Sequence, residues 1–149
     1  MTHPEKPMPG INIYSGEGGL GGALTNPTEL AYRKGNLSER YPVRYAGRIW
    51  ADAEEAYHAL KSGSCLEADR VMIEIIAAKF QQYPELAKQV RDRGGSAFLQ
   101  TCSHHTGARS QSARSWEGQG MRSRFIRNLT AGFQMSEDGA VELGQRPLF

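Results

Sequence analysis

The chain has 149 residues, enough for one domain that buries roughly 68–70% of its unfolded surface. Hydrophobic residues make up 39% and charged residues 23%, an ordinary composition for a globular domain, and the net charge of +2 is too small to attract duplex nucleic acid by overall charge. No run of about 18 apolar residues is present, and the first ten residues lack an apolar segment. We therefore expect no membrane anchor, no signal peptide and a cytoplasmic location.

The predicted domain organisation is simple. Residues 1–10 contain three prolines and are predicted to be a flexible leader, followed by a single domain over residues 11–149. The two cysteines, Cys65 and Cys102, are far apart and match no zinc-binding spacing, so we expect two reduced thiols.

A glycine-rich segment follows the first predicted strand, which covers residues 11–14. Residues 16–21 satisfy a GxGxxG pattern, the fingerprint of dinucleotide-binding folds. That fold needs a long helix after the third glycine, and Pro27 interrupts such a helix. We therefore predict a mobile loop, with a lid over a ligand as the alternative.

Residues 41–61 have the pattern of a hairpin followed by a helix. Alternating apolar residues begin at Tyr41, Gly47 supplies the turn, and residues 48–50 form the returning arm. Asp52 is a favourable N-cap, with Glu55 at the spacing of a capping box. This places the start of a helix directly after the hairpin.

The predicted helix has an apolar row formed by Ala53, Ala56 and Leu60. An adjoining stripe carries, at helical spacing, Glu54, Tyr57, His58 and Lys61. A solvated polar face is the ordinary interpretation of such a stripe. The small alanines, which allow close packing, and Trp50, an aromatic wall beside Glu54, weaken that interpretation and leave a functional site as the alternative.

The remaining predicted elements, in chain order, are a helix over residues 68–82, a helix over 84–93, a short strand over 97–102, a polar loop over 103–120, a helix over 122–131 and a hairpin around Asp138 and Gly139. The first of these has the strongest helical pattern in the chain and is predicted to be the core helix.

A basic region lies near the C-terminal end of the chain. Five arginines between Arg109 and Arg127 accompany a single acid, Glu117, which suits phosphate recognition by guanidinium groups, with a solvated basic face as the alternative. The adjacent pair His104 and His105 is not expected to bind a metal, because successive side chains point apart.

Glu54 and Lys61 together suit the cleavage of a glycosidic bond. A carboxylate near apolar walls can act as an acid or a base. A desolvated lysine can lose its proton and attack a sugar carbon to form a Schiff base.

Several segments of the chain resemble, in order and in character, the NADAR family, also called YbiA-like proteins: residues 11–15, 24–26, 41–61 and 78–86. The most specific motif of the family has a tryptophan, then a glutamate, an aromatic residue and a lysine along one helix. These positions match Trp50, Glu54, Tyr57 and Lys61.

The resemblance implies an α+β fold, and with the elements above we expect a mostly helical single domain with a small antiparallel sheet. It also implies a hydrolase that cleaves an N-glycosidic bond and needs no metal or cofactor. The implied substrates are nucleotide-like: ADP-ribosylated nucleobases, possible also within nucleic acid, or phosphoribosylated pyrimidine intermediates of riboflavin synthesis. Family members carry an aspartate before a Trp-Gly pair, for which Glu117 or His105 are the candidate replacements here, and Ser123 takes the place of an asparagine.

Two functions follow as hypotheses. In an N-glycosidase, Glu54 would transfer protons and Lys61 would act as nucleophile or electrostatic stabiliser. The predicted substrate-binding residues are Asn26, Trp50, Tyr57, Trp116, Arg122 and Arg124, with the tryptophans stacking and Asn26 and the arginines holding ribose or phosphate. The alternative is a binding module that holds a nucleotide or ADP-ribose-derived ligand without cleaving it. The sequence leaves the oligomeric state open.

Overall fold

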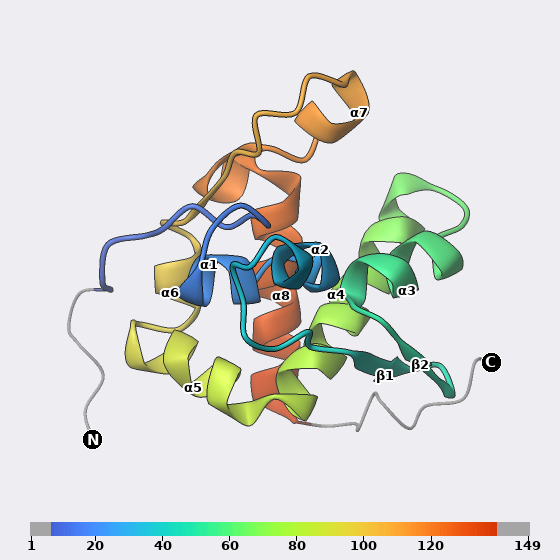
Figure 1. Cartoon of the computed structure of the whole chain (residues 1–149), viewed down its shortest axis with the longest axis horizontal. Coiled ribbons are helices and arrows are strands. Elements are labelled where there is room, and N and C mark those ends of the chain that lie inside the picture. The colour runs from blue at the N-terminus through green and yellow to red at the C-terminus, as the bar shows by residue number, and fades with distance from the viewer. Residues whose placement is uncertain (1–6, 140–149) are drawn as a thin grey trace.

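The computed structural model describes residues 7–139 and has a mostly helical α+β architecture with small antiparallel sheets, which confirms the predicted fold class (Figure 1). Two long helices, α4 (Cys65–Gln82) and α8 (Arg124–Asp138), pack against each other at the centre. The other elements are α1 (Gly19–Ala23), α2 (Thr28–Arg33), β1 (Val43–Tyr45), β2 (Arg48–Trp50), α3 (Ala53–Leu60), α5 (Pro84–Asp92), α6 (Ser96–Leu99), β3 (Ser103–His104), α7 (Gln111–Arg114), β4 (Gly118–Gln119) and the 3-10 helix η1 (Gly120–Arg122).

The contact between α4 and α8 forms the centre of the core. Ile75, Ile76 and Phe80 of α4 are buried, and the Phe80 ring meets the Phe133 ring edge-on with centroids 5.3 Å apart. Gly132 permits the close approach of the two helices, because a Cβ at this position would lie 2.6 Å from Cγ2 of Ile76. The predicted core helix is therefore correct in position, although it begins at Cys65 rather than at residue 68.

The hairpin and the capped helix form as predicted. Val43 pairs with Trp50 and Tyr45 with Arg48 in an antiparallel register, and the turn uses positive φ at both Ala46 and Gly47. Oδ1 of Asp52 accepts a hydrogen bond from the backbone N–H of Glu55 at 2.8 Å. Oδ2 of Asp52 accepts a second bond from the N–H of Glu29 at 3.0 Å, so one buried carboxylate holds the starts of α2 and α3 together.

The glycine-rich segment differs from its prediction. Gly19–Ala23 forms the short helix α1, packed so closely that a Cβ on Gly21 would lie 2.7 Å from the carbonyl oxygen of Asn12. Helix α2 was not predicted, because Pro27 was interpreted as a helix breaker. Proline is tolerated at a helix start, where its missing N–H is not needed, and Pro27 lies directly before Thr28.

Two further predictions for the C-terminal half were wrong. Residues 97–102 do not form a strand: Ser96–Leu99 is the helix α6, which buries Phe98 and Leu99 after a turn with positive φ at Gly94 and Gly95. Asp138 belongs to α8 rather than to a hairpin, since Phe133 continues the buried row and Gly139 ends the helix in the left-handed conformation. The rest of that predicted hairpin, from residue 140, lies outside the described residues.

The predicted polar loop over 103–120 contains the short elements β3, α7 and β4. β3 pairs with β4 in a second two-stranded sheet. Of the predicted strand over residues 11–14, only Asn12 pairs within residues 7–139, in a single parallel bridge with Ser103. Residues 7–10 lie on the surface, where the N–H of Met8 donates to the carbonyl of Arg93 at 2.8 Å. Residues 1–6 of the predicted leader lie outside the described part. Among residues 7–139, no helix combines the length and apolarity needed to cross a membrane.

Candidate functional site

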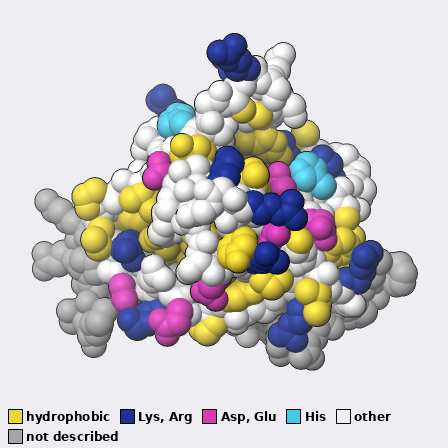
Figure 2. Space-filling model, viewed as in Figure 1, with side chains coloured by type: hydrophobic (Ala, Val, Ile, Leu, Met, Phe, Trp, Pro, Cys, Tyr) yellow, Lys and Arg dark blue, Asp and Glu magenta, His cyan; other side chains and the backbone are white. Residues whose placement is uncertain are grey.

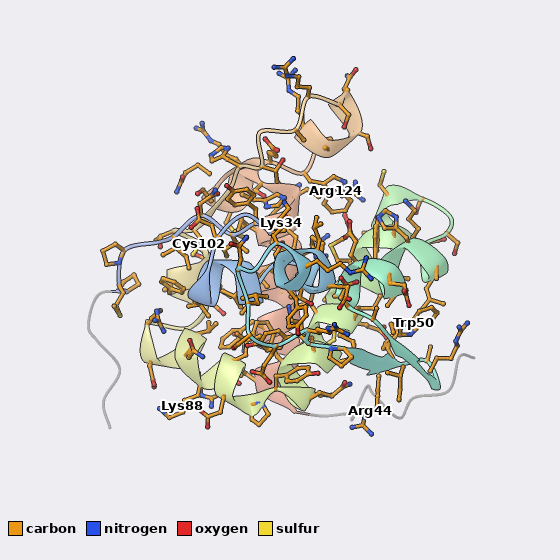
Figure 3. The ribbon with its side chains drawn as sticks, viewed as in Figure 1. Lys34, Arg44, Trp50, Lys88, Cys102 and Arg124 are labelled. Carbon is orange, nitrogen blue, oxygen red and sulfur yellow. The ribbon has the colours of Figure 1, made fainter. Side chains whose placement is uncertain are left out.

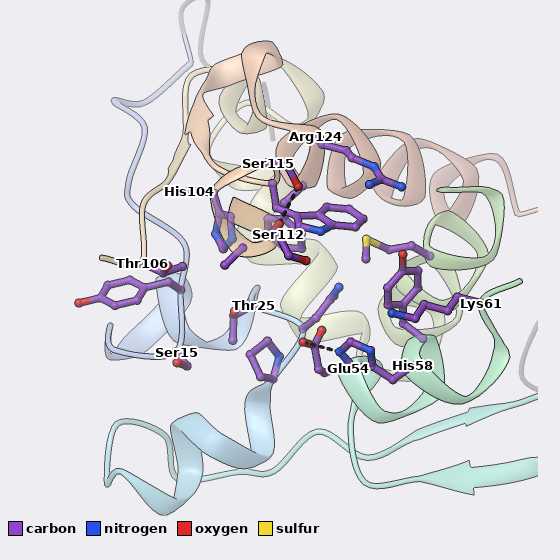
Figure 4. A pocket seen from close by; sticks show the side chains of 18 residues that line it. Ser15, Thr25, Glu54, His58, Lys61, His104, Thr106, Ser112, Ser115 and Arg124 are labelled. Atoms are coloured by element: carbon purple, nitrogen blue, oxygen red, sulfur yellow. Dashed lines mark hydrogen bonds and ion pairs between the residues drawn. The ribbon is translucent and has the colours of Figure 1, made fainter. Parts of the chain in front are cut away.

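A pocket of about 390 Å³ lies between two walls that are far apart in the sequence (Figure 4). We call the first the α3 wall, formed by the turn at residues 25–27 and the residues of α3 and its end up to Lys61. We call the second the loop wall, formed by pocket-lining residues between 104 and 125. Met72 of the core helix α4 also lines the pocket.

The α3 wall contains a carboxylate–imidazole pair. Oε2 of Glu54 lies 3.1 Å from Nε2 of His58, one helical turn later, and both side chains are partly exposed to the pocket. The backbone N–H of Glu54 donates to the carbonyl of Asn26 at 3.3 Å. The start of α3 is thereby tied to the turn that carries Asn26.

Tyr57 and Lys61 continue the same wall. The Tyr57 ring is buried, and burial raises the pKa of its hydroxyl, while the nearby Arg124 acts in the opposite direction. Lys61 follows the last residue of α3 in an extended conformation, and its Nζ lies 5.4 Å from the centroid of the Tyr57 ring. Lys61 also lines the pocket, and it is exposed.

Trp116 and Arg124 meet these residues from the loop wall. The Trp116 ring packs edge-on against Tyr57, with centroids 5.8 Å apart, and Cζ of Arg124 lies 3.8 Å from the centroid of the indole. Nε of Arg124 donates to Oδ1 of Asp69 at 2.8 Å, and Asn128 donates to the same oxygen at 3.0 Å. Arg124 is therefore held in place by α4 and α8, with its flat face against the indole.

Ser123 connects Trp116 to the start of α8. Its hydroxyl donates to the carbonyl of Trp116 at 2.7 Å and accepts from the N–H of Ile126 at 3.1 Å as the N-cap. This residue, which stands at the asparagine position of the resemblance, thus has a defined role in placing the indole.

Two buried polar residues, Asn26 and Lys79, support the α3 wall. Asn26 is buried and lines the pocket, and its Oδ1 has no hydrogen-bond partner within residues 7–139. Lys79 is completely buried, and its Nζ donates to the carbonyls of Ala23 at 2.6 Å and Thr25 at 2.8 Å. Burial lowers the pKa of Lys79 to about 7, while Asp52 acts in the opposite direction.

The sequence prediction missed the role of Lys79. The signal that could have revealed it is the position of this lysine within the apolar row of the core helix, three and four residues after Ile76 and Ile75. A charged residue on a buried face must be satisfied by other polar groups. Two backbone carbonyls of a distant turn satisfy it here.

His104 lines the pocket from the loop wall, whereas the sequence analysis considered it only as part of the His104–His105 pair, which was not expected to bind a metal. Nδ1 of His104 lies 2.6 Å from the carbonyl oxygen of Ile13, and its ring packs on Phe125 with centroids 4.7 Å apart. Burial is the main cause that lowers the pKa of this imidazole below 6.5.

The two candidates for the missing acid, Glu117 and His105, do not line the pocket. The carboxylate of Glu117 accepts hydrogen bonds from the hydroxyl and the N–H of Thr106, and the bond from the hydroxyl is the main cause that lowers its pKa. His105 is exposed.

Two predicted binding residues also lie outside the pocket. Trp50 lies in the hairpin (Figure 3) and is buried. Its Nε1 donates to the carbonyl of Tyr45 at 3.0 Å, and Cζ of Arg48 lies 4.5 Å from the centroid of its ring. Arg122 belongs to η1 and is exposed, with its carbonyl accepting from Arg127 at 3.3 Å. Trp50 is paired with Val43 across the hairpin and both residues are buried, which explains the position of Trp50.

Charges of both signs are interspersed over the face of the molecule in Figure 2, and no large patch of one sign stands out on that face. Within the described part of the chain, no three His, Cys, Asp or Glu side chains gather as metal ligands would.

No family model, curated protein or solved structure matches the chain in the three comparisons. The resemblance to the NADAR family therefore stays a prediction.

Proposed function

We propose that the protein is a hydrolase that cleaves an N-glycosidic bond in a nucleotide-like substrate, either an ADP-ribosylated nucleobase or a phosphoribosylated pyrimidine. The observation that carries the proposal is the Glu54–His58 pair, which faces a pocket with aromatic rings and cations around it. Cleavage of this bond needs a proton for the leaving nitrogen and negative charge near the developing sugar cation. The carboxylate of Glu54 can supply the negative charge, and the imidazole of His58 beside it can donate a proton.

The other pocket residues suit the remaining parts of such a substrate. The indole of Trp116 offers a flat surface for stacking, with Arg124 fixed against it. Lys61, exposed at the rim, is placed to contact a phosphate group. Of the two roles considered for Lys61, this position supports electrostatic stabilisation more than nucleophilic attack, because a nucleophilic lysine is usually desolvated.

The pocket volume limits which part of the substrate is enclosed. A volume of about 390 Å³ lies near the lower end of the range of roughly 300–1,000 Å³ for small-molecule sites. It suits the base and the adjoining ribose. The rest of an ADP-ribose group would extend past the rim.

The test is to incubate the purified protein with ADP-ribosylated guanosine and, separately, with a phosphoribosylated pyrimidine, and to quantify the released base by chromatography. Glu54→Gln is expected to lower the rate by about 10²-fold or more, the usual contribution of a positioned acid–base group. Glu55→Gln is the matched control, since Glu55 lies on the same helix but outside the pocket. Full activity of the Glu54→Gln protein would contradict the assignment. Trapping with borohydride would reveal a Schiff base on Lys61 if one forms.

The second candidate function is a binding module for the same ligands. It is favoured by one observation: neither Glu117 nor His105, the predicted replacements for the family aspartate, lines the pocket. The same chromatography separates the two functions. Stoichiometric binding with the ligand recovered unchanged would support the binding module.

A further inference from the structure

We infer that His104 is the catalytic base on the loop wall, accepting a proton from the attacking water through Nε2. The inference rests on the proposed function, and it gives the second acid–base role to a residue that the sequence did not identify as functional. His104 lines the pocket from β3, whereas Glu54 and His58 line it from α3 (Figure 4). The two groups therefore reach the pocket from separate walls.

The hydrogen bond to Ile13 fixes which nitrogen carries the proton. A carbonyl oxygen can only accept, so Nδ1 of His104 must be the donor in the 2.6 Å contact. In the neutral ring, Nε2 is then the nitrogen with the free lone pair. No other residue between 7 and 139 forms a hydrogen bond with Nε2, so it remains available to a ligand or a water molecule.

The backbone on both sides of His104 holds this arrangement. The N–H of Ile13 donates to the carbonyl of Ser103 at 2.8 Å, and the N–H of Ser103 donates to the carbonyl of Ile11 at 3.0 Å. The side-chain amide of Asn12 accepts from the N–H of His105 and donates to its carbonyl, both at 2.9 Å. The Ile13 carbonyl is thereby kept opposite the imidazole.

The surroundings of the ring favour its neutral form. Phe125 of α8 packs on the ring and excludes water from one side. The charged and titratable groups that act on it are Glu117 beside β4, His105 in the neighbouring loop position and Glu54 from α3, and their influence is smaller than that of burial, which lowers the pKa. The lone pair is therefore present at neutral pH, as a base requires.

The proposed hydrolysis forms one bond at C1′ of the ribose and breaks another. The oxygen of a water molecule forms a bond with C1′ of the ribose, and the bond between C1′ and the base nitrogen breaks with its electron pair moving to the nitrogen. One water proton passes to Nε2 of His104, and the other stays on the new C1′ hydroxyl. The leaving nitrogen takes the proton held by the Glu54–His58 pair. Exchange with solvent then restores both groups.

The first test compares His104→Gln with His105→Gln in the base-release assay from pH 5 to 9. We expect kcat of His104→Gln to fall about 10²-fold with KM changed only a few-fold, because the base acts in the transition state. The decrease in wild-type kcat on the acid side, as His104 gains its proton, should disappear in this variant. His105→Gln, which changes an exposed neighbour outside the pocket, should retain the wild-type rate at neutral pH and keep the decrease on the acid side. A His104→Gln protein with kcat within threefold of wild type and an unchanged acid limb would overturn the inference.

Two further measurements separate catalysis from a structural effect. Imidazole added to His104→Ala should restore part of the rate if the lost group is a base, whereas a rate unchanged by imidazole in a folded variant would argue against the role. Nitrogen-15 NMR of the wild-type protein should show the proton of His104 on Nδ1 at neutral pH, and a proton on Nε2 would overturn the inference whatever the activity. If the wild-type protein cleaves no substrate, the proposed function fails, and the catalytic role of His104 fails with it.

Discussion

The two walls of the pocket are stabilised in different ways. The α3 wall is held by buried charged groups that bind backbone atoms: Asp52 joins the starts of α2 and α3, and Lys79 binds the turn before Asn26. The loop wall combines the first residues of α8 with a segment whose elements have only two to four residues, and side-chain contacts such as Arg124 with Trp116 position it. Figure 1 shows α7 projecting from the rest of the molecule. The comparison indicates that mutations behind the α3 wall should affect folding, whereas mutations in the loop wall should mainly affect the ligand.

The largest expected effect on stability is that of Lys79→Ala. The substitution removes two hydrogen bonds from a fully buried group and leaves a cavity, so we expect the free energy of unfolding to fall by about 3 kcal/mol. Urea denaturation followed by circular dichroism measures it. Lys88→Ala is the control, because Lys88 is exposed on α5, and its denaturation midpoint should remain close to that of wild type. Equal midpoints for both variants would contradict the role of Lys79.

The second prediction concerns pH. The pKa of Lys79 is about 7 in the folded protein and about 10.4 in an unfolded chain, so between these values the unfolded state binds more protons and stability rises with pH. We expect the unfolding free energy of wild type, relative to Lys79→Met, to increase by about 2 kcal/mol from pH 7 to pH 9.

The range from pH 7 to pH 9 lies below the pH at which ionisation of the tyrosines affects stability. The pKa values of Tyr41, Tyr57 and Tyr83 are raised, chiefly by burial, and these groups reduce stability only above pH about 10. If the difference in unfolding free energy between wild type and Lys79→Met stays constant from pH 7 to pH 9, Lys79 keeps its ordinary pKa.

The third prediction tests the shared cap. Asp52→Ala should lower the free energy of unfolding by about 1.5 kcal/mol, because the N–H groups of both Glu29 and Glu55 lose their acceptor. Asp52→Asn keeps an acceptor oxygen for one of the two bonds and should fall between wild type and Asp52→Ala. Thermal denaturation of the three proteins checks this order, and an Asp52→Asn protein no more stable than Asp52→Ala would show that the charge matters rather than the acceptor.

The smallest expected energetic effect belongs to the loop wall and appears in binding. Trp116→Leu should leave the denaturation midpoint nearly unchanged but weaken binding of a nucleotide ligand by about 1 kcal/mol, roughly fivefold, through lost stacking. Isothermal titration calorimetry measures the affinity. A large loss of stability with unchanged affinity would reverse the distinction between the two walls.

The same difference explains how far the sequence could predict the site. Asp52 and Glu55 are three residues apart, and Glu54 and Tyr57 lie on one stripe of α3 that Lys61 follows directly, so local patterns were sufficient for these residues of the α3 wall but not for Lys79. Contacts over long sequence separations were not visible. His104 takes its proton position from Ile13, 91 residues earlier, and Arg124 is oriented by Asp69, 55 residues earlier.

The prediction for Trp50 was wrong for a different reason, because a local pattern suggested a site residue where the fold buries the side chain. Its place two residues before the cap residue Asp52 suggested a wall of the site, but the strand pairing that buries it in the hairpin decides its orientation. The fold class, in contrast, was predictable because the core helix and the helix after Pro84 have clear apolar periods. The short elements between residues 96 and 122 lack such periods.

The most direct test of the central claim, that both walls together bind the ligand, is an NMR titration of the Glu54→Gln protein with uncleaved ADP-ribosylated guanosine. We predict shift changes at the indole N–H of Trp116, at the ring of His104 and at the backbone of α3 around Tyr57, with one common dissociation constant. Shift changes confined to one wall would contradict the claim. So would shift changes located outside the pocket, around α5 and the end of α8.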